Sequence, residues 1–332
     1  KLTFSVNEFS EKLYKNEHLK EFSFLKDHAE ICPETGKQIL PLSVQESTLK
    51  HIYSKNPKKE KEIITGEREK GVNKLFKTGD ILNSVLEECF TDVNINEDYI
   101  RLLKQRFISP ISTHLAIGFY RYFIADTLMV GNDKCIEVNF TPNNPQDFGF
   151  MGSLYVLADS SYRLKKAMLE IPLRSDVNYV EHLNIIQEFN ILPTGEQVLA
   201  VDKMIVQLKV TEFVTKFQVQ RNTFYNNFSL EEIPEKTFKF AGERKTESNA
   251  SLRDEAFWQQ QRPEKLMKSE EDMDKMLKSM SEMNNFKIFL FIGKAFIENF
   301  VETSSSPEKP SKVDIGPVNT IFSQNFVDGF RL

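Results

Sequence analysis

Few of the side chains that usually perform acid–base or metal chemistry are grouped in this sequence. No two of its five histidines have the HxH or HxxxH spacing that would place both on one face of a strand or a helix. The motifs GxSxG, GxxxxGK(S/T) and GxGxxG, which build nucleophile and phosphate sites, are absent. The sequence therefore predicts no catalytic residue, no metal site and no cofactor. A catalytic group assembled from distant residues needs no local motif, so an enzyme stays open.

Four carboxylates fall in or beside predicted strands, and nothing in the sequence pairs them: Asp126, Asp159, Glu170 and Asp202. His182 and Glu188 lie on one face of a single predicted strand, but six residues separate them by about 20 Å. Direct proton transfer between them is excluded at that distance. A hydrolase remains an alternative function, and it requires a cleft in which acids and histidines converge.

The composition is that of a globular protein with no bias toward nucleic acid. The 332 residues include 40% hydrophobic and 27% charged side chains, and 43 basic against 48 acidic residues give a net charge of −5. Cys32, Cys89 and Cys135 include no CxxC pair, which excludes a disulfide framework and the usual zinc spacings. The unusual feature is an excess of phenylalanine, with 28 Phe against 9 Tyr and 1 Trp.

The central region, 113–245, alternates apolar and polar residues with the period of two that is typical of strands. Runs such as 135–140, 150–157, 183–189 and 198–208 are separated by short turn sequences. Six or seven strands with short connections predict an antiparallel meander. Apolar residues on one face and polar residues on the other favour a strongly curved sheet that is covered by helices.

The flanking regions are predicted to be helical. In 1–112, helices are expected near 9–22, 81–89 and 96–107, and the Lys- and Glu-rich stretch 50–77 is interpreted as a solvated helix face or as a contact for acidic headgroups or an acidic partner. In 246–332, a charged helix is expected at about 263–285, with a methionine stripe that either packs on the core or forms a partner groove.

The predicted fold class is therefore α+β. N-terminal helices (1–112) would pack on a curved antiparallel β-meander (113–245), which resembles the half-barrel of periplasmic lipoprotein carriers. A linker, a charged helix and a further segment (246–332) would follow. Aromatic and aliphatic residues on the apolar sheet face would line a ligand groove or form ordinary core: Phe140, Phe148, Phe150, Leu154, Phe189, Phe213 and Phe217.

A collinear set of short sequences runs through most of the chain and resembles one known family. The stretches are Glu34–Lys37, Lys55–Lys59, Phe107–Ile111, Tyr120–Asp126, Phe140–Pro142, Phe150–Gly152, Asn178–Val180, Gln187–Phe189, Asp314–Pro317 and Ser323–Arg331. Their order and spacing resemble the Bacteroidota envelope proteins called carboxypeptidase-like regulatory-domain proteins (domain of unknown function 5686). Asp328 replaces the glutamate that is usual in the last stretch of that family.

The resemblance implies a periplasmic middle region at the outer membrane, with a regulatory-like β-domain before it and an outer-membrane β-barrel after it in the same protein. We therefore expect a non-enzymatic module that binds a lipid, a lipoprotein or an envelope partner through the apolar sheet face. A hydrolase acting on envelope polymers is one alternative, and a structural spacer between the regulatory-like domain and the barrel is the other. Asp126-Thr127-Leu128 also resembles the O-glycosylation sequon of Bacteroidota envelope proteins, with Thr127 as the acceptor, or it is a plain strand-end turn.

Overall fold

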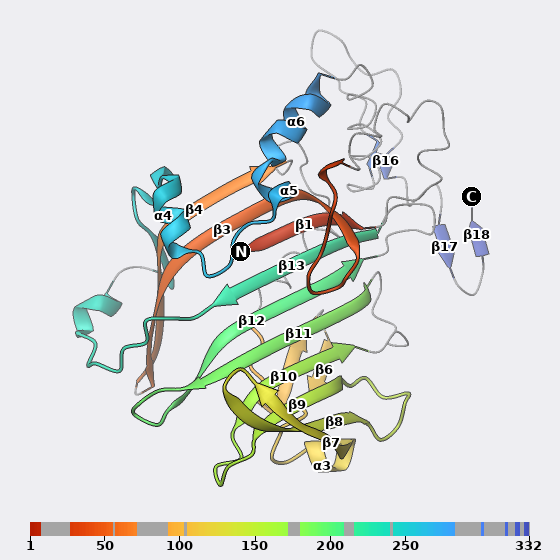
Figure 1. Cartoon of the computed structure of the whole chain (residues 1–332), viewed down its shortest axis with the longest axis vertical. Helices are drawn as coiled ribbons and strands as arrows, with labels where there is room; N and C mark the ends of the chain where they lie inside the picture. Colours follow the sequence, from red (N-terminus) through yellow and green to blue (C-terminus); the bar gives the residue numbers. More distant parts are fainter. Residues whose placement is uncertain are drawn as a thin grey trace.

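The fold is built on one large open β-sheet (Figure 1). The computed structural model describes residues 1–7, 27–55, 57–71, 92–102, 105–171, 180–208, 216–239 and 242–282, together with four short strands after residue 299. Strands make up more than half of the residues that the structure describes. Twelve of them join in the order β14-β4-β3-β1-β13-β12-β11-β10-β9-β8-β7, with β2 paired to β3 beside this path.

The strands of this sheet come from the first two predicted regions, and β14 reaches the third by one residue. Their bounds are β1 Leu2–Asn7, β2 Glu30–Ile31, β3 Gln38–Lys55, β4 Lys58–Gly71, β7 Tyr120–Val130, β8 Asp133–Pro142, β9 Met151–Leu157, β10 Leu164–Ile171, β11 Val180–Ile191, β12 Gln197–Leu208, β13 Lys216–Phe224 and β14 Arg244–Thr246. All neighbours pair antiparallel except β14, which runs parallel to β4. The predicted antiparallel β-sheet is thus confirmed, and β14 makes the sheet mixed.

The predicted α+β class is wrong, because the N-terminal region contributes strands where helices were expected. β3 and β4 form a long hairpin that includes most of the Lys- and Glu-rich stretch. Lys50, His51, Lys59 and Glu60 are all exposed near the far end of this hairpin. Both faces of the hairpin meet water there, so charged residues occupy both faces and the period of two disappears from the sequence.

The helix expected at 96–107 is a second β-hairpin, formed by β5 (Tyr99–Leu102) and β6 (Gln105–Ile108). Ile100, Leu102 and Phe107 are buried and alternate with exposed neighbours. Strands of four residues are too short for this alternation to outweigh a helical reading. The helices expected near 9–22 and 81–89 lie outside the described residues.

The described helices are short: α3 (Ala116–Phe119), α4 (Glu255–Gln261), α5 (Lys268–Glu271) and α6 (Met273–Ser281). α5 and α6 lie within the range predicted as one charged helix, and Met273 and Met276 of its methionine stripe are buried. The open mixed sheet replaces the predicted half-barrel.

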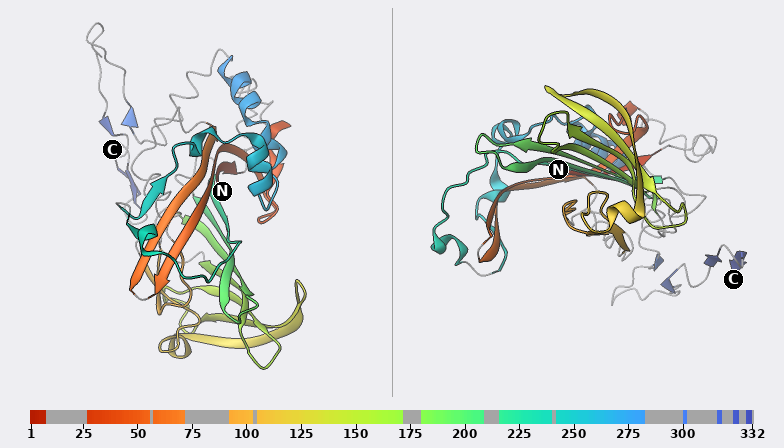
Figure 2. Two further views of the ribbon diagram at one scale, coloured as in Figure 1. Left: turned by 90° about the vertical axis from the view of Figure 1, so that its left-hand side faces the viewer. Right: turned by 90° about the horizontal axis from the view of Figure 1, so that it is seen from below.

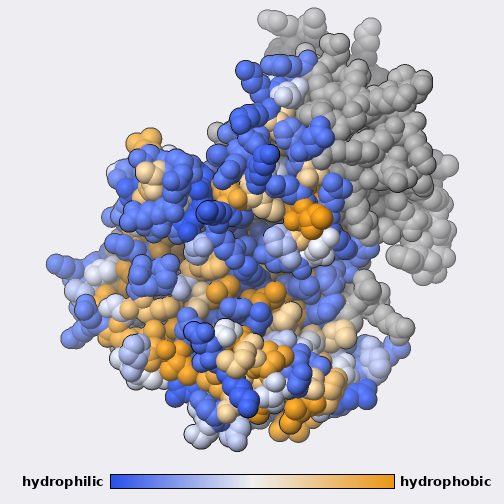
Figure 3. All heavy atoms as spheres, in the orientation of Figure 1, coloured by the Kyte–Doolittle hydropathy of each residue, from blue (hydrophilic) through white to orange (hydrophobic). Residues whose placement is uncertain are grey.

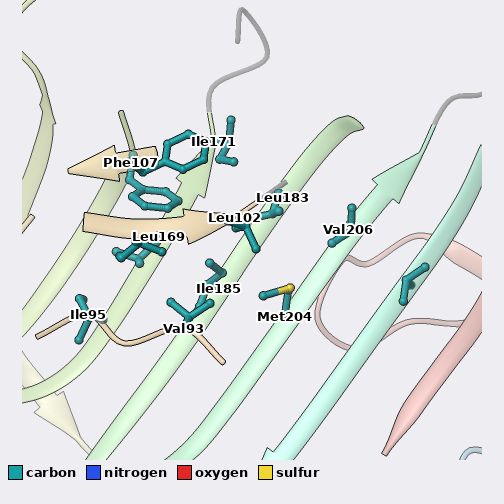
Figure 4. Close-up of a cluster of buried hydrophobic side chains, with 14 of the residues drawn as sticks. Val93, Ile95, Leu102, Phe107, Leu169, Ile171, Leu183, Ile185, Met204 and Val206 are labelled. Atoms are coloured by element: carbon teal, nitrogen blue, oxygen red, sulfur yellow. The ribbon is translucent and has the colours of Figure 1, made fainter. Parts of the chain in front are cut away.

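The two faces of the sheet are covered differently. The segment 92–112, which contains the β5–β6 hairpin, lies on the concave face, here called the inner face, and α4–α6 lie on the opposite, outer face (Figure 2). Side chains of β10–β12 and of the hairpin meet in one buried cluster, in which Phe107, Leu169, Ile185 and Met204 take part (Figure 4). The hydrophobic core therefore fills the curved side of the sheet between the strands and the chain's own hairpin.

Candidate functional site

The apolar face predicted to bind a ligand contributes mainly to this core. Five of its seven residues are buried: Phe140, Phe150, Leu154, Phe189 and Phe217. Phe148 is 46% exposed, and Phe213 lies outside the described residues. The rings of Phe107 and Phe150 contact each other, with centroids 4.8 Å apart. The hairpin thus occupies the side of the sheet where the sequence placed a groove, and ligand binding by these residues stays a prediction.

Polar side chains of the sheet hold the covering segment by its backbone carbonyls. The Tyr120 hydroxyl donates to the carbonyl of Ile108 at 2.6 Å and accepts from the Phe150 N–H at 3.1 Å, while the Tyr122 hydroxyl donates to the carbonyl of Pro110 at 2.8 Å. Burial raises the pKa of Tyr120 and raises that of Tyr122 to about 12. Both hydroxyls therefore stay protonated and able to donate.

A buried ion pair fastens the same segment at its start. The Arg221 guanidinium pairs with the Asp202 carboxylate, and Gln187 Nε2 bridges Asp202 Oδ1 at 3.0 Å and the carbonyl of Val93 at 2.7 Å. Asp202, Arg221 and Gln187 are each under 10% exposed. Because buried charges are tolerated only when they are paired and hydrogen-bonded, this cluster acts as a structural anchor.

The remaining candidates for acid–base work are spread over separate elements. Glu170 pairs with His182 at 3.3 Å, and Glu188 pairs with Lys166 at 2.9 Å. Asp159 accepts from the backbone and side chain of Ser161, and these two hydrogen bonds lower its pKa. Within the described ranges, no three His, Cys, Asp or Glu side chains are arranged to hold a metal ion. None of the described helices has the length and apolar character to cross a membrane.

One surface that remains open to a partner lies on the outer face of β9–β11. Met151 and Met168 are 38% and 37% exposed, although both lie within strands. Tyr155 and Ile186, which are half-buried, lie next to Met168. Ile186 is its direct partner on β11, and the Tyr155 hydroxyl lies 3.8 Å from the Met168 sulfur. We call these four residues the outer-face patch. Figure 3 shows hydrophobic residues gathered over the lower strands on this face.

Charged and polar groups surround the outer-face patch. The His182–Glu170 and Lys166–Glu188 pairs lie on the same face, next to Met151 and Met168 in the strand register. An apolar centre rich in Met and Tyr within a polar rim is the arrangement found at the centre of protein–protein interfaces. Methionine side chains adapt their shape to different partners.

The sequence shows that apolar and polar residues alternate in this strand, but it predicts no binding role for the face that carries Met151. Met151, Ser153 and Tyr155 follow one another on one face of a predicted strand. Their neighbours Met168 and Ile186 come from other strands, and only the pairing register brings them together.

The last predicted site residue, Thr127, lies on the edge strand β7 and is exposed, and its backbone N–H donates to Asp126 Oδ1 at 2.7 Å. Its glycosylation stays a prediction.

The comparisons with known proteins identify a family without a known activity. Residues 1–228 match the family described as Family of unknown function (DUF5686). The match covers every strand from β1 to β13 and confirms the resemblance to that domain of unknown function. No curated protein and no solved structure matches the chain. Since the match spans more than half of its 332 residues, the chain belongs to the DUF5686 family.

Proposed function

We propose that this chain is a non-enzymatic interaction module of a cell-envelope protein and that it binds a protein partner through the outer-face patch. The observation that carries the proposal is the exposure of Met151 and Met168 in the middle of a sheet face whose opposite side is filled by the β5–β6 hairpin. Side chains of this kind on an open surface lose water when a partner covers them, and that loss favours association.

A protein surface fits the patch better than a free acyl chain does. Apolar small ligands bind in concave sites that bury most of their surface. The patch lies on the outer side of a curved sheet, and its rim carries Lys166, His182 and two carboxylates that can pair with opposite charges on a protein.

The family resemblance supports a place for this module. The proposed setting is the periplasmic side of the outer membrane of a Bacteroidota cell, between a carboxypeptidase-like regulatory domain and an outer-membrane β-barrel of the same protein. The proposed partner is a lipoprotein or that barrel in cis.

Site-specific photo-crosslinking in native cells tests this proposal. A photoreactive phenylalanine analogue is placed at Met168 in the complete gene product, and the matched control carries it at Leu252, which is 79% exposed in the segment between β14 and α4. We expect one discrete protein adduct from position 168 and none from position 252. Equal adducts from both positions, or adducts with lipid alone, would refute the patch as a protein-binding surface.

Two further measurements separate the parts of the proposal. The double substitution Met151→Ser and Met168→Ser should abolish the adduct formed by the analogue at Ile186 without changing the thermal unfolding of the isolated chain by more than a few degrees. Membrane fractionation of the native cells should recover the protein with the outer membrane. Recovery in the cytoplasmic fraction would contradict the proposed location. The crosslinking experiment would still test whether the patch binds a protein.

A further inference from the structure

β7 ends the sheet, and its outer edge is open along its length. The strand pairs with β8, and no other strand within the described ranges pairs with it. Residues 121–127 are all exposed, and Phe123 and Ile124 are 53% and 72% exposed. A long edge strand with exposed apolar side chains is a template for pairing with another strand.

The pairing of β7 with β8 shows which of its side chains share a face. Phe123 is opposite Asn139, Ile124 is opposite Val138, and Asp126 is opposite Glu137, so Ala125 is an inserted residue in a β-bulge. Cross-strand partners point to the same side of a sheet. Arg121, Phe123 and Asp126 therefore lie together on the outer face, and Tyr122 and Ile124 lie together on the inner face.

The bulge makes the edge complementary to itself. Counted along the pairs that β7 forms with β8, Asp126 lies two pairs after Phe123, and Arg121 lies two pairs before Phe123. Without the inserted Ala125, Arg121 and Asp126 would lie on opposite faces. A second β7 strand, placed antiparallel about a two-fold axis at Phe123, would meet the first with Arg121 opposite Asp126 twice on the outer face.

We propose that the β7 edge is a homodimer interface, in which two copies of this chain pair their β7 strands antiparallel with Phe123 opposite Phe123. Arg121 of each copy then faces Asp126 of the other, and Tyr122 of each copy faces Ile124 of the other on the inner face. A two-fold interface needs one patch that complements itself, and this edge meets that requirement in charge and in apolar contact. The proposal is independent of the outer-face patch.

The two charges are available for such pairing. Arg121 Nη2 donates to the carbonyl of Asn143 at 3.2 Å, and Asp126 Oδ1 accepts from the Thr127 N–H. Over the ranges that the structure describes, neither side chain has an ion-pair partner closer than 4.0 Å. A strand from another protein would need the same charges at the same spacing, which a second copy supplies by symmetry.

Charge exchange tests the register by sedimentation velocity over a range of concentrations. Stable interfaces usually involve about 20–30 residues a side, so a single strand pair predicts a dimer that dissociates on dilution. Arg121→Glu and Asp126→Lys should each weaken dimerisation about tenfold or more, since each change places like charges opposite one another twice. The double variant should restore wild-type dimerisation. Lys134→Glu, an equal change of charge one strand inward, should leave dimerisation unchanged.

Cysteine crosslinking supplies a second readout. It uses a background variant that carries Cys89→Ser, because the other two cysteines, Cys32 and Cys135, are buried. Phe123→Cys places two directly opposite thiols at the axis and should give a disulfide-linked dimer on mild oxidation. Ile124→Cys places its thiols diagonally, about 7–8 Å apart at their Cβ atoms, and should not. A chain that stays monomeric at every soluble concentration would overturn the proposal. So would a dimer that is indifferent to both charge reversals, or one that crosslinks equally through both cysteines.

Discussion

Arg262 Nε and Nη2 donate to the two carboxylate oxygens of Glu46 at 2.6 and 2.9 Å, although the two residues are 216 positions apart in the sequence. Arg68 Nε donates to the same carboxylate at 2.6 Å from the neighbouring strand. The exposed fraction of the Glu46 side chain is 5%. One buried carboxylate therefore joins β3, β4 and the segment that follows α4, and Glu255, which contacts both arginines, balances their second positive charge.

Removing this carboxylate should destabilise the fold strongly. Glu46→Ala leaves two largely buried guanidinium groups without their shared acceptor, and breaking a buried ion pair in this way costs about 3–5 kcal/mol. Glu255 still contacts both arginines, so we expect a loss near the lower limit. Urea denaturation measures the change. Glu67→Ala, an exposed glutamate on β4, is the control and should change the free energy of unfolding by less than about 0.5 kcal/mol.

Gly152 should tolerate no side chain. Its φ is +151°, and a Cβ at this position would overlap the carbonyl oxygen of Met168 on the next strand. Gly152→Ala therefore requires β9 and β10 to separate, and we expect a cost of about 3 kcal/mol from overpacking and backbone strain. Gly131→Ala is the matched control, because φ is +61° there but no atom lies within 4 Å of the added Cβ. Thermal unfolding should show a clearly smaller loss for Gly131→Ala.

Tyr120→Phe should loosen the β5–β6 hairpin from the sheet. The substitution removes one hydroxyl and leaves the Ile108 carbonyl and the Phe150 N–H without their shared partner. An unsatisfied buried polar group costs about 1–3 kcal/mol, and we expect a total loss of about 2 kcal/mol. Hydrogen exchange of the amides in 99–108 should accelerate. Tyr155→Phe removes a half-buried hydroxyl that donates to Glu137, and equal acceleration in that variant would contradict the assignment.

The contact between Glu34 and Lys203 should make stability depend on pH at both extremes. Burial alone would raise the pKa of Glu34, but hydrogen bonding by Gln220 and the charge of Lys203 hold it below its ordinary value of 4.5. Burial alone would lower the pKa of Lys203, but Glu264 and Glu34 hold it above 10.5. The lowered pKa of Glu34 stabilises the folded state at pH values above the ordinary pKa of a glutamate. The raised pKa of Lys203 stabilises it at pH values below the ordinary pKa of a lysine.

Glu34→Gln should therefore cost stability between about pH 5 and pH 10, and the cost should shrink as the pH falls below about 4 and Glu34 of the wild type becomes protonated. Urea denaturation at a series of pH values measures this difference. Glu67→Gln, on the exposed face of β4, is the control. A cost that stays constant from pH 7 to pH 3 would show that Glu34 acts through packing and not through its charge.

The sequence predicts the sheet best where one face is buried and the other is not. Leu183, Ile185 and Phe189 are buried and alternate with half-buried residues, and the strand β11 lies where this period places it. The same reasoning fails in β4, because solvent surrounds the far end of its hairpin and removes the contrast between its faces. It also fails in β5, where four residues are too few to distinguish a strand from a helix.

The candidate surfaces depend on information that the sequence does not hold locally. Met168 and Tyr155 become neighbours through the register of β9 and β10, and Arg121 and Asp126 share a face only because Ala125 is an inserted residue. Neither a register nor a bulge has a marked signature in a single sequence. The seven residues of the predicted apolar face, in contrast, could be selected by hydrophobicity alone, which identifies buried residues without distinguishing core from groove.

The position of β1 in the middle of the sheet has a consequence for how the protein is made. Leu2 pairs with Arg221 on one side and with Gln45 on the other, so β1 lacks one of its neighbours until the residues of β13 have been synthesised. The β7–β12 meander joins strands that are near in sequence and can form earlier, because short loops close at a smaller entropic cost. The centre of the completed sheet thus forms late, when β1 pairs with a strand that is synthesised roughly two hundred residues after it.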